Sequence, residues 1–275
     1  IMPKPDLMAL TGGYRRTPVL QIGAEIYCDT ALICRVIDRL YPANSVYPLE
    51  QAAALGAAVH WTDTFLFKVS VAVAFQPKAL AGSDLFSDQA AAAAFMADRA
   101  ELSKGSTELG IDLKIAVPYW TMHMQRLDAQ LSTADFLGGD KPNVLDFSTY
   151  HCCWFVYKNE ALKPELEQFP ALAQWMLRIA GFGHGEIVSI NGEEAVAIAR
   201  DSDIATAPKA TDFVDEQLSV GTSVDVMPID YGFQPTQGEL LLASTEEIVI
   251  KRVDERAGNV AVHFPRLGFQ VNASQ

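Results

Sequence analysis

The period of the apolar residues changes twice along this 275-residue chain, and these changes constrain the fold more than any other feature. Short β-type runs fill the first part, about 150 residues of helical periodicity follow Pro48, and β-like alternation returns after Pro208. The sequence therefore predicts three parts: residues 1–45, residues 46–205 and residues 210–275.

The first part is predicted to be strand, strand and helix. Pro18 opens a short strand that runs to Ile22, and a very short connection leads to a second strand over 25–28. Asp29 or Thr30 then caps an apolar-periodic helix. This unit is too small to bury its own sheet face.

The second part is predicted to be all-α. Two local signals support it: Pro118 has the residue type favoured in a first helical turn, and Asn143 and Asp146 have the spacing of a capping box. The predicted helices span 49–75, 87–104, 118–131, 143–159, 164–179 with an interruption at 169–170, and 193–200.

The third part is predicted to be a small twisted sheet or open barrel of about 60 residues. Its β-like runs are 223–226, 239–242, 247–253 and 260–264, and residues 255–259 resemble a hairpin tip.

Charge and composition exclude several classes of partner. With 21 Lys and Arg against 34 Asp and Glu, the net charge is −13, which disfavours binding to nucleic acid or to anionic membranes. Apolar residues make up 49% of the chain, but no run is long enough to span a membrane and no export signal is visible. We expect a soluble, cytoplasmic protein.

Cysteine and histidine give no sign of a metal site. The four cysteines, Cys28, Cys34, Cys152 and Cys153, form no C-x-x-C pair, and they are expected to be small apolar residues in a reduced compartment. The five histidines lack the spacing of known metal motifs. No metal is predicted.

One group of residues suits an extended, charged peptide ligand. Thr17 precedes a proline and is held extended, and with a cis bond its main chain would be free to pair with a ligand. Asp29 and Thr30 lie at a helix start, which offers N–H groups to a carboxylate while Asp29 accepts from an ammonium. This combination suits the γ-glutamyl end of glutathione. The alternative is that Asp29 only caps the helix and Pro18 only starts a strand.

Two segments make the pattern recognisable. Residues 12–22 and 27–30 resemble the second half of the thioredoxin-like domain of glutathione transferases, and residues 136–147 resemble the loop and buried capping box of that family's helical domain. The resemblance covers residues 1–205. It implies a multi-domain, mainly α protein: a partial thioredoxin-like α/β unit, an all-α glutathione-transferase-type domain and a small all-β appendage.

The resemblance also implies the roles of particular residues. Thr17, before Pro18, would bind the cysteinyl part of glutathione through its main chain; Asp29 and Thr30 would hold the γ-glutamyl group, and Arg16 would lie near the glycyl end. Glutathione would be the co-substrate. The wall of an apolar substrate pocket would comprise Trp61, Phe65, Tyr119, Trp120 and Met122, although helical spacing fits core packing equally well.

The thiol-activating residue of this family (Tyr, Ser or Cys) lies in a strand–helix–strand unit near the start of the thioredoxin-like domain. This chain opens at Ile1, close to the end of that unit, so we expect a truncated N-terminus and assign no catalytic residue. The resemblance implies a homodimeric, glutathione-dependent transferase that acts on an apolar electrophile through an activated thiol. The alternatives are a non-catalytic binding or scaffold protein, and a glutathione-dependent lyase or isomerase.

Overall fold

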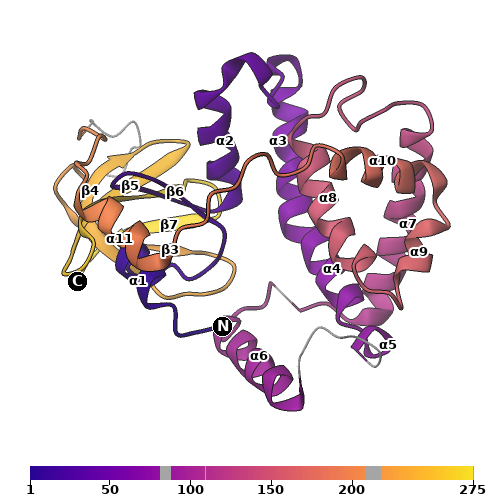
Figure 1. The fold of residues 1–275 in the computed structure, drawn as a ribbon, viewed down its shortest axis with the longest axis horizontal. Coiled ribbons are helices and arrows are strands. Elements are labelled where there is room, and N and C mark those ends of the chain that lie inside the picture. The colour runs from indigo at the N-terminus through magenta and orange to yellow at the C-terminus, as the bar shows by residue number, and fades with distance from the viewer. Residues whose placement is uncertain (81–87, 109, 209–217, 275) are drawn as a thin grey trace. The chain divides into compact units, whose positions relative to one another are not determined.

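The computed structural model describes residues 1–80, 88–108, 110–208 and 218–274. These residues form two compact units (Figure 1). The first unit comprises Ile1–Ile37, Ala93–Thr107 and Val188–Gln275, and the second comprises Asp38–Ala92 and Glu108–Ile187. The three-part division expected from the sequence stays a prediction.

A seven-stranded sheet is the centre of the first unit. Its strand order is β1-β2-β6-β5-β4-β3-β7, and all neighbours are antiparallel except β2 and β6, which are parallel. The strands are β1 (Val19–Ile22), β2 (Glu25–Cys28), β3 (Ser223–Pro228), β4 (Thr236–Ala243), β5 (Glu247–Asp254), β6 (Gly258–Pro265) and β7 (Phe269–Ala273).

The C-terminal strands differ from expectation, because they extend the N-terminal hairpin and do not form a sheet or barrel of their own. An unpaired strand edge presents a row of unsatisfied N–H and C=O groups. The edge of β2 is satisfied by β6, where the Ala261 N–H donates to the Ala24 carbonyl at 3.0 Å. One core joins both ends of the chain: Tyr14, Ile26, Cys28, Val262 and Phe264 all lie in it.

Two helices of the first unit, α1 (Pro5–Thr11) and α11 (Gly192–Arg200), pack on each other and on β6. The sequence did not predict α1. It ends at Gly12, whose φ of 80° favours glycine. A Cβ at Gly12 would also lie 2.1 Å from Nε of Arg252, so a larger residue there requires the Arg252 side chain to move.

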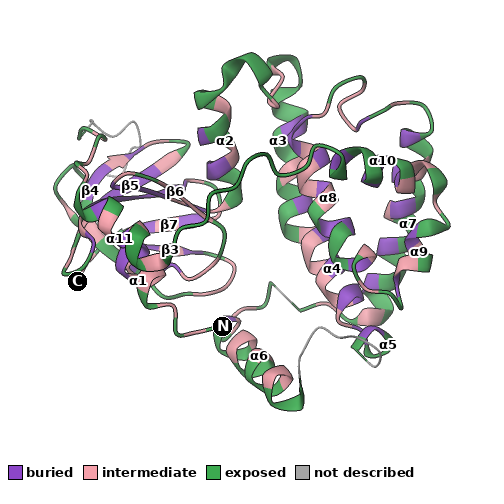
Figure 2. Cartoon of the chain, in the orientation of Figure 1, coloured by how far each residue is buried: buried purple, intermediate pink, exposed green. Residues whose placement is uncertain are grey.

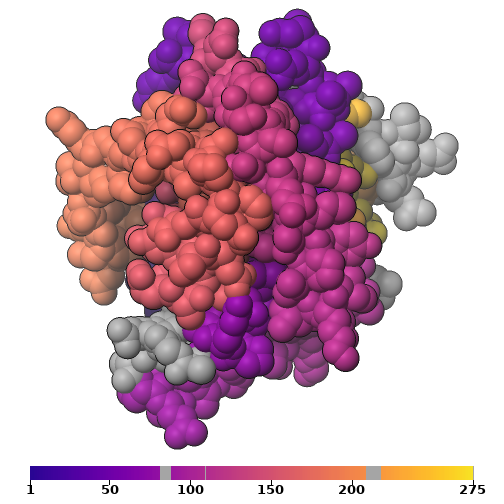
Figure 3. All heavy atoms as spheres, turned by 90° about the vertical axis from the view of Figure 1, so that its right-hand side faces the viewer, coloured from indigo at the N-terminus to yellow at the C-terminus, as the bar shows by residue number. Residues whose placement is uncertain are grey.

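The second unit is helical in its described residues, with short 3₁₀ turns at Pro42–Asn44 and Leu49–Gln51. The helix predicted over 193–200 is present as α11, but it belongs to the first unit. Within it, α4 packs on α7 and α8, and α10 packs on α7. Buried positions are purple in Figure 2, and Figure 3 shows α7 beside α10 on one face. The helices are α3 (Ala52–Trp61), a π-helical turn (Thr62–Leu66), α4 (Phe67–Ala74), α5 (Pro77–Leu80), α7 (Leu113–Leu131), α8 (Val144–Tyr157), α9 (Lys163–Glu167) and α10 (Pro170–Ala180). Helix α2 (Thr30–Leu40) and helix α6 (Gln89–Leu102) each have residues in both units.

The predicted capping box at the start of α8 is present. The Asn143 side chain accepts a hydrogen bond from the Leu145 N–H at 2.9 Å, and the Asp146 carboxylate accepts from the Asn143 N–H at 3.0 Å. The same buried carboxylate accepts from the Leu137 N–H at 2.7 Å and from Nε1 of Trp175 at 2.8 Å. Asp146 thus ties α8 to the preceding loop and to α10.

The expected start of α7 at Pro118 is wrong. The helix begins at Leu113, where the Asp112 side chain caps it by accepting from the Lys114 N–H at 2.8 Å. Pro118 is therefore inside the helix, where proline removes a donor. Ala116 and Trp120, on either side of Pro118, are buried, and their packing compensates for the missing hydrogen bond.

Candidate functional site

The Thr17–Pro18 step and the Asp29–Thr30 step lie at the same end of the β1–β2 hairpin. The register pairs Val19 with Cys28, so Pro18 and Asp29 are the next residues on the two neighbouring strands. Thr17 and Pro18 are exposed, and the peptide bond between them is cis. The structure thus brings together the two segments that the sequence associated with a peptide ligand.

Asp29 is held firmly at the start of α2. Its φ of 74° is left-handed, a conformation that Asp tolerates better than most residues. Its carboxylate accepts from the Ala31 N–H at 3.0 Å and its carbonyl accepts from the Ile33 N–H at 3.0 Å, which makes it the N-cap. Burial raises the pKa of Asp29, while the Ala31 amide and the charge of Arg16 oppose the rise. Thr30 follows, exposed, as the first residue of the helix.

Arg16 has partners that the sequence did not indicate. Its guanidinium forms an ion pair with Asp230, with Nη1 3.2 Å from Oδ2 and Nη2 bonded to Oδ1. Nη2 also donates to the Tyr231 carbonyl, and the guanidinium carbon lies 3.6 Å from the centroid of the Tyr231 ring. Asp230 is 214 residues from Arg16, so no local pattern could have predicted this contact.

The turn at 230–232 packs closely beside Arg16. Gly232, with a φ of 70°, donates its N–H to the Leu102 carbonyl at 2.9 Å. A Cβ at Gly232 would lie 3.1 Å from Leu102 and 3.7 Å from Nε of Arg16. A cavity of about 270 Å³ opens next to this turn. Its lining residues are Arg15, Glu101, Leu102, Lys104, Gly232, Phe233 and Gln234.

A second, aromatic cavity lies in the helical unit. Four of the five residues named for the substrate pocket line it together: Trp61, Phe65, Tyr119 and Met122. The remaining lining residues are Leu66, Val69, His123 and Arg126. Its volume of about 30 Å³ has room for little more than water, so a larger ligand needs its walls to move. Trp61 and Tyr119 are 42% and 45% exposed, which leaves room for that movement.

Trp120, which the sequence grouped with those four residues, does not line this cavity. It is 3% exposed and lies in the helical core with Met124. Residues 120 and 124 share one face of α7, whereas 119 and 122 share another, because a helix has 3.6 residues per turn.

His123, which from the sequence is expected to be a helix-packing or pocket residue rather than a metal ligand, lies in the wall of this cavity. Its ring lies 5.0 Å from the Trp61 ring, between centroids. Burial and the neighbouring charge of Arg126 lower its pKa to about 4, so the imidazole is neutral at physiological pH. The cavity wall therefore combines neutral aromatic and apolar side chains with the cation Arg126.

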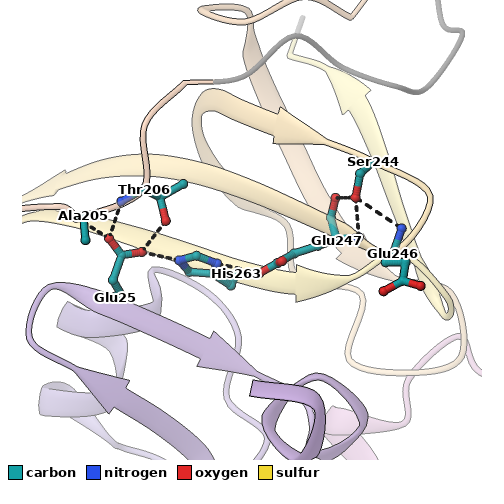
Figure 4. Close-up of polar contacts among 7 residues, drawn as sticks. All are labelled: Glu25, Ala205, Thr206, Ser244, Glu246, Glu247 and His263. Atoms are coloured by element: carbon teal, nitrogen blue, oxygen red, sulfur yellow. Dashed lines mark hydrogen bonds and ion pairs between the residues drawn. The ribbon is translucent and has the colours of Figure 1, made fainter. Parts of the chain in front are cut away.

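A buried polar group in the sheet was also missed (Figure 4). His263 on β6 is hydrogen-bonded through Nε2 to Glu25 on β2, and through Nδ1 to Glu247 on β5 at 2.7 Å. Glu25 also accepts from the N–H groups of Ala205 and Thr206 at 2.6 and 2.9 Å. The sequence signal that could have predicted this group is a charged residue inside an apolar β-type run. A carboxylate that is buried in such a strand needs a polar partner.

In the described ranges, no set of three His, Cys, Asp or Glu side chains is arranged to hold a metal ion. No helix in the part of the chain that the structure describes is long and apolar enough to cross a membrane.

Comparison with known proteins identifies the family. Residues 2–45 match the model of the glutathione S-transferase N-terminal domain, and residues 112–181 match that of the C-terminal domain. The crystal structure of a GST-like protein from Pseudomonas syringae is 36% identical, with a TM-score of 0.82 over 100% of this chain and 87% of that one. A beta-etherase from Sphingobium sp. strain SYK-6 is 18% identical, with a TM-score of 0.42 over 60% of this chain and 74% of that one. No curated protein matches.

The chain belongs to the glutathione S-transferase family. The fold class expected from the sequence is confirmed: a mainly α, glutathione-transferase-like fold with additional C-terminal strands.

Proposed function

We propose that the chain binds glutathione at the end of the β1–β2 hairpin and uses the thiol of this co-substrate to attack an apolar electrophile. The observation that carries the proposal is the position of Asp29. Its carboxylate is held at the N-cap of α2, next in register to the exposed Pro18. A carboxylate fixed beside free helix N–H groups suits a ligand end that carries both an ammonium and a carboxylate.

Each residue then has a distinct part in binding. The Thr17 main chain pairs with the cysteinyl part of glutathione, as strands pair with extended peptides. Asp29 accepts from the γ-glutamyl ammonium, and the Thr30 hydroxyl, at the first helical position, binds the adjoining carboxylate. Arg16 lies on the side of the glycyl end.

The chemistry that follows is thiol substitution. A thiol with a pKa near about 8.5 is mostly protonated at neutral pH, so a donor that stabilises the thiolate accelerates attack. The sulfur forms a bond to the electrophilic carbon, and the leaving group departs with the bonding electron pair. Trp61, Phe65, Tyr119 and Met122 are proposed to contact the apolar substrate. We assign the thiol-activating role to no residue of this chain.

Glutathione titration calorimetry tests the binding site. Asp29→Ala is expected to weaken binding by at least about tenfold, because a charge-assisted contact is lost. Asp112→Ala, which removes the N-cap of another helix, α7, controls for the loss of a cap and should bind like the wild type. Equal affinity of the two variants for glutathione would contradict the proposed site.

Two other functions remain as alternatives on the same fold: a non-catalytic glutathione-binding scaffold, and a glutathione-dependent lyase or isomerase. Turnover of a generic aryl halide with glutathione supports the transferase. Binding of glutathione without turnover of any electrophile favours the scaffold. We also propose a homodimer, and sedimentation equilibrium measures it directly.

A further inference from the structure

Asp230 and Tyr231 bind the guanidinium of Arg16, the cation proposed to lie near the glycyl end of glutathione. Both Nη atoms of Arg16 bond to the Asp230 carboxylate, and Nη2 also bonds to the Tyr231 carbonyl. A guanidinium holds a carboxylate best through two parallel bonds, and Asp230 already has this arrangement. We infer that Asp230 is an internal competitor for the ligand carboxylate nearest Arg16, so that glutathione pairs with Arg16 only when Asp230 leaves it. This inference rests on the proposed function.

These bonds use three of the five N–H donors of Arg16, and the two that remain, the Nε–H and one Nη1–H, do not lie side by side and provide no other two-bond contact. Nε is buried and has no hydrogen-bond partner in the described part of the chain. Gly232 lies beside it, close enough that a Cβ there would be 3.7 Å away. A ligand carboxylate therefore gains a two-bond contact with Arg16 only by replacing Asp230.

The exposed fractions indicate which partner moves. The Arg16 side chain is 13% exposed, whereas the Asp230 side chain is 34% exposed. The turn itself is anchored by the bond from Gly232 to Leu102 at 2.9 Å and by a bond from Ser106 to the Asp230 carbonyl. We therefore expect the Asp230 side chain to rotate towards solvent while its backbone stays in place.

Electrostatics link this exchange to the other end of the site. Arg16 lowers the pKa of Asp29, and Asp230 raises it, so both lie within range of the carboxylate proposed to hold the ligand ammonium. If Asp230→Asn acted only by changing the charge near Asp29, it would change the affinity of every ligand that binds Asp29. Direct competition would affect only a ligand that carries the glycyl carboxylate.

This difference sets the experiment. Binding of glutathione and of γ-glutamylcysteine, which lacks the glycyl carboxylate, is measured by calorimetry for the wild type and Asp230→Asn. Competition predicts that Asp230→Asn binds glutathione at least about fivefold more tightly, because a charge-assisted pair is released. It also predicts that affinity for γ-glutamylcysteine stays within about twofold.

Three control variants define the effect. Asp230→Glu keeps the carboxylate and should resemble the wild type. Asp6→Asn removes another ion pair of the same unit, to Arg256 at 2.6 Å, and should change neither affinity. In an Arg16→Gln background, Asp230→Asn should have no effect on glutathione binding. If Asp230→Asn does not fold, Asp230→Ser also removes the carboxylate from Arg16 and should tighten glutathione binding in the same selective way.

The outcomes separate this inference from the proposed function. The competition is overturned if Asp230→Asn binds glutathione no more tightly than the wild type, or if it binds both peptides more tightly. The proposed glutathione site still stands in that case, provided that binding depends on Asp29. If neither the wild type nor Asp230→Asn binds either peptide, the competition and the proposed function are both overturned. Glutathione binding by Asp230→Asn but not by the wild type supports both.

Discussion

His263 is a buried cation between two acids. Its side chain is 4% exposed, and its two ring nitrogens contact Glu25 and Glu247. Burial alone would lower its pKa, but the hydrogen bonds to the two carboxylates raise it above 6.5. Burial likewise opposes ionisation of Glu25, but the bonds from His263 and Thr206 lower its pKa to about 2. Both nitrogens therefore act as donors in the folded protein, and the Tyr27 ring lies 4.2 Å from the imidazole.

This arrangement predicts how the stability of the first unit depends on pH. Because the folded pKa of His263 is raised, its contribution is complete below pH 6.5 and is lost as the pH rises through the folded value. Because the folded pKa of Glu25 is lowered, its contribution is complete above pH 4.5 and is lost as the pH falls towards 2. We expect maximal stability between pH 4.5 and 6.5.

Reactivity of Cys28 under increasing denaturant measures this dependence, because Cys28 is fully buried in the core beneath the same sheet that contains His263. His263→Gln should be destabilised by on the order of 3 kcal/mol, since it leaves two carboxylates without a cation. It should also lose the decline in stability above pH 6.5. A His263→Gln variant with the alkaline decline of the wild type would refute the assignment.

Residue positions show where sequence-based prediction succeeded and where it did not. The Asp29 cap and the β1–β2 hairpin depend on neighbours within a few positions, so their residue types predict them. Glu25 and His263 are 238 residues apart, and Arg16 and Asp230 are 214 residues apart. Such contacts depend on strand pairing across the whole chain, which a single sequence does not display.

Helices and strands were likewise predicted where local residues determine them and missed where distant contacts do. The start of α8 was predicted because its capping box lies within four residues, and the structure contains it. The start of α7 was misplaced because a proline usually marks a first turn, whereas here Asp112 begins the helix and tertiary packing carries it past Pro118. The pairing of β2 with β6 could not be predicted, because both strands have ordinary β-type sequences that fit several partners.

Helix α8 provides a test of the second unit. Asp146→Ala removes a fully buried carboxylate and leaves four donors, including Nε1 of Trp175, without an acceptor. We expect a loss on the order of 3–5 kcal/mol in the free energy of unfolding. Tryptophan fluorescence measures the unfolding of the second unit, since all four tryptophans lie in it.

Asp112→Ala is again the matched control, because it removes the exposed cap of α7 and should cost only about 1 kcal/mol. A loss of similar size in the two variants would show that the buried network around Asp146 contributes no more than an ordinary cap.

At the scale of the whole molecule, the cysteines divide between the two cores. Cys28 is buried in the sheet unit, and Cys152 and Cys153 are buried in the helical unit. Burial raises the pKa of all three thiols, which suppresses the reactive thiolate. Cys34, on α2, is only half-buried.

We therefore expect a thiol reagent to modify Cys34 alone in the native protein. With rising denaturant, modification of Cys28 should follow the unfolding of the sheet unit, and modification of Cys152 and Cys153 that of the helical unit. Mass spectrometry of the labelled peptides distinguishes the sites. Rapid labelling of Cys28 in native buffer would contradict the closed core between the hairpin and the C-terminal strands.

The parallel pairing of β2 with β6 also has a consequence for biosynthesis. Glu25 leaves the ribosome 238 residues before His263, a delay of roughly 10–50 s at common translation rates. Ile187, the last residue of the helical unit, is made before β6 begins at Gly258, so the helical unit is complete while the β2 edge still lacks the strand that covers it. Nascent chains stalled before β6 should thus carry a folded helical unit and an unprotected hairpin, which makes this interval the stage at which chaperones matter most.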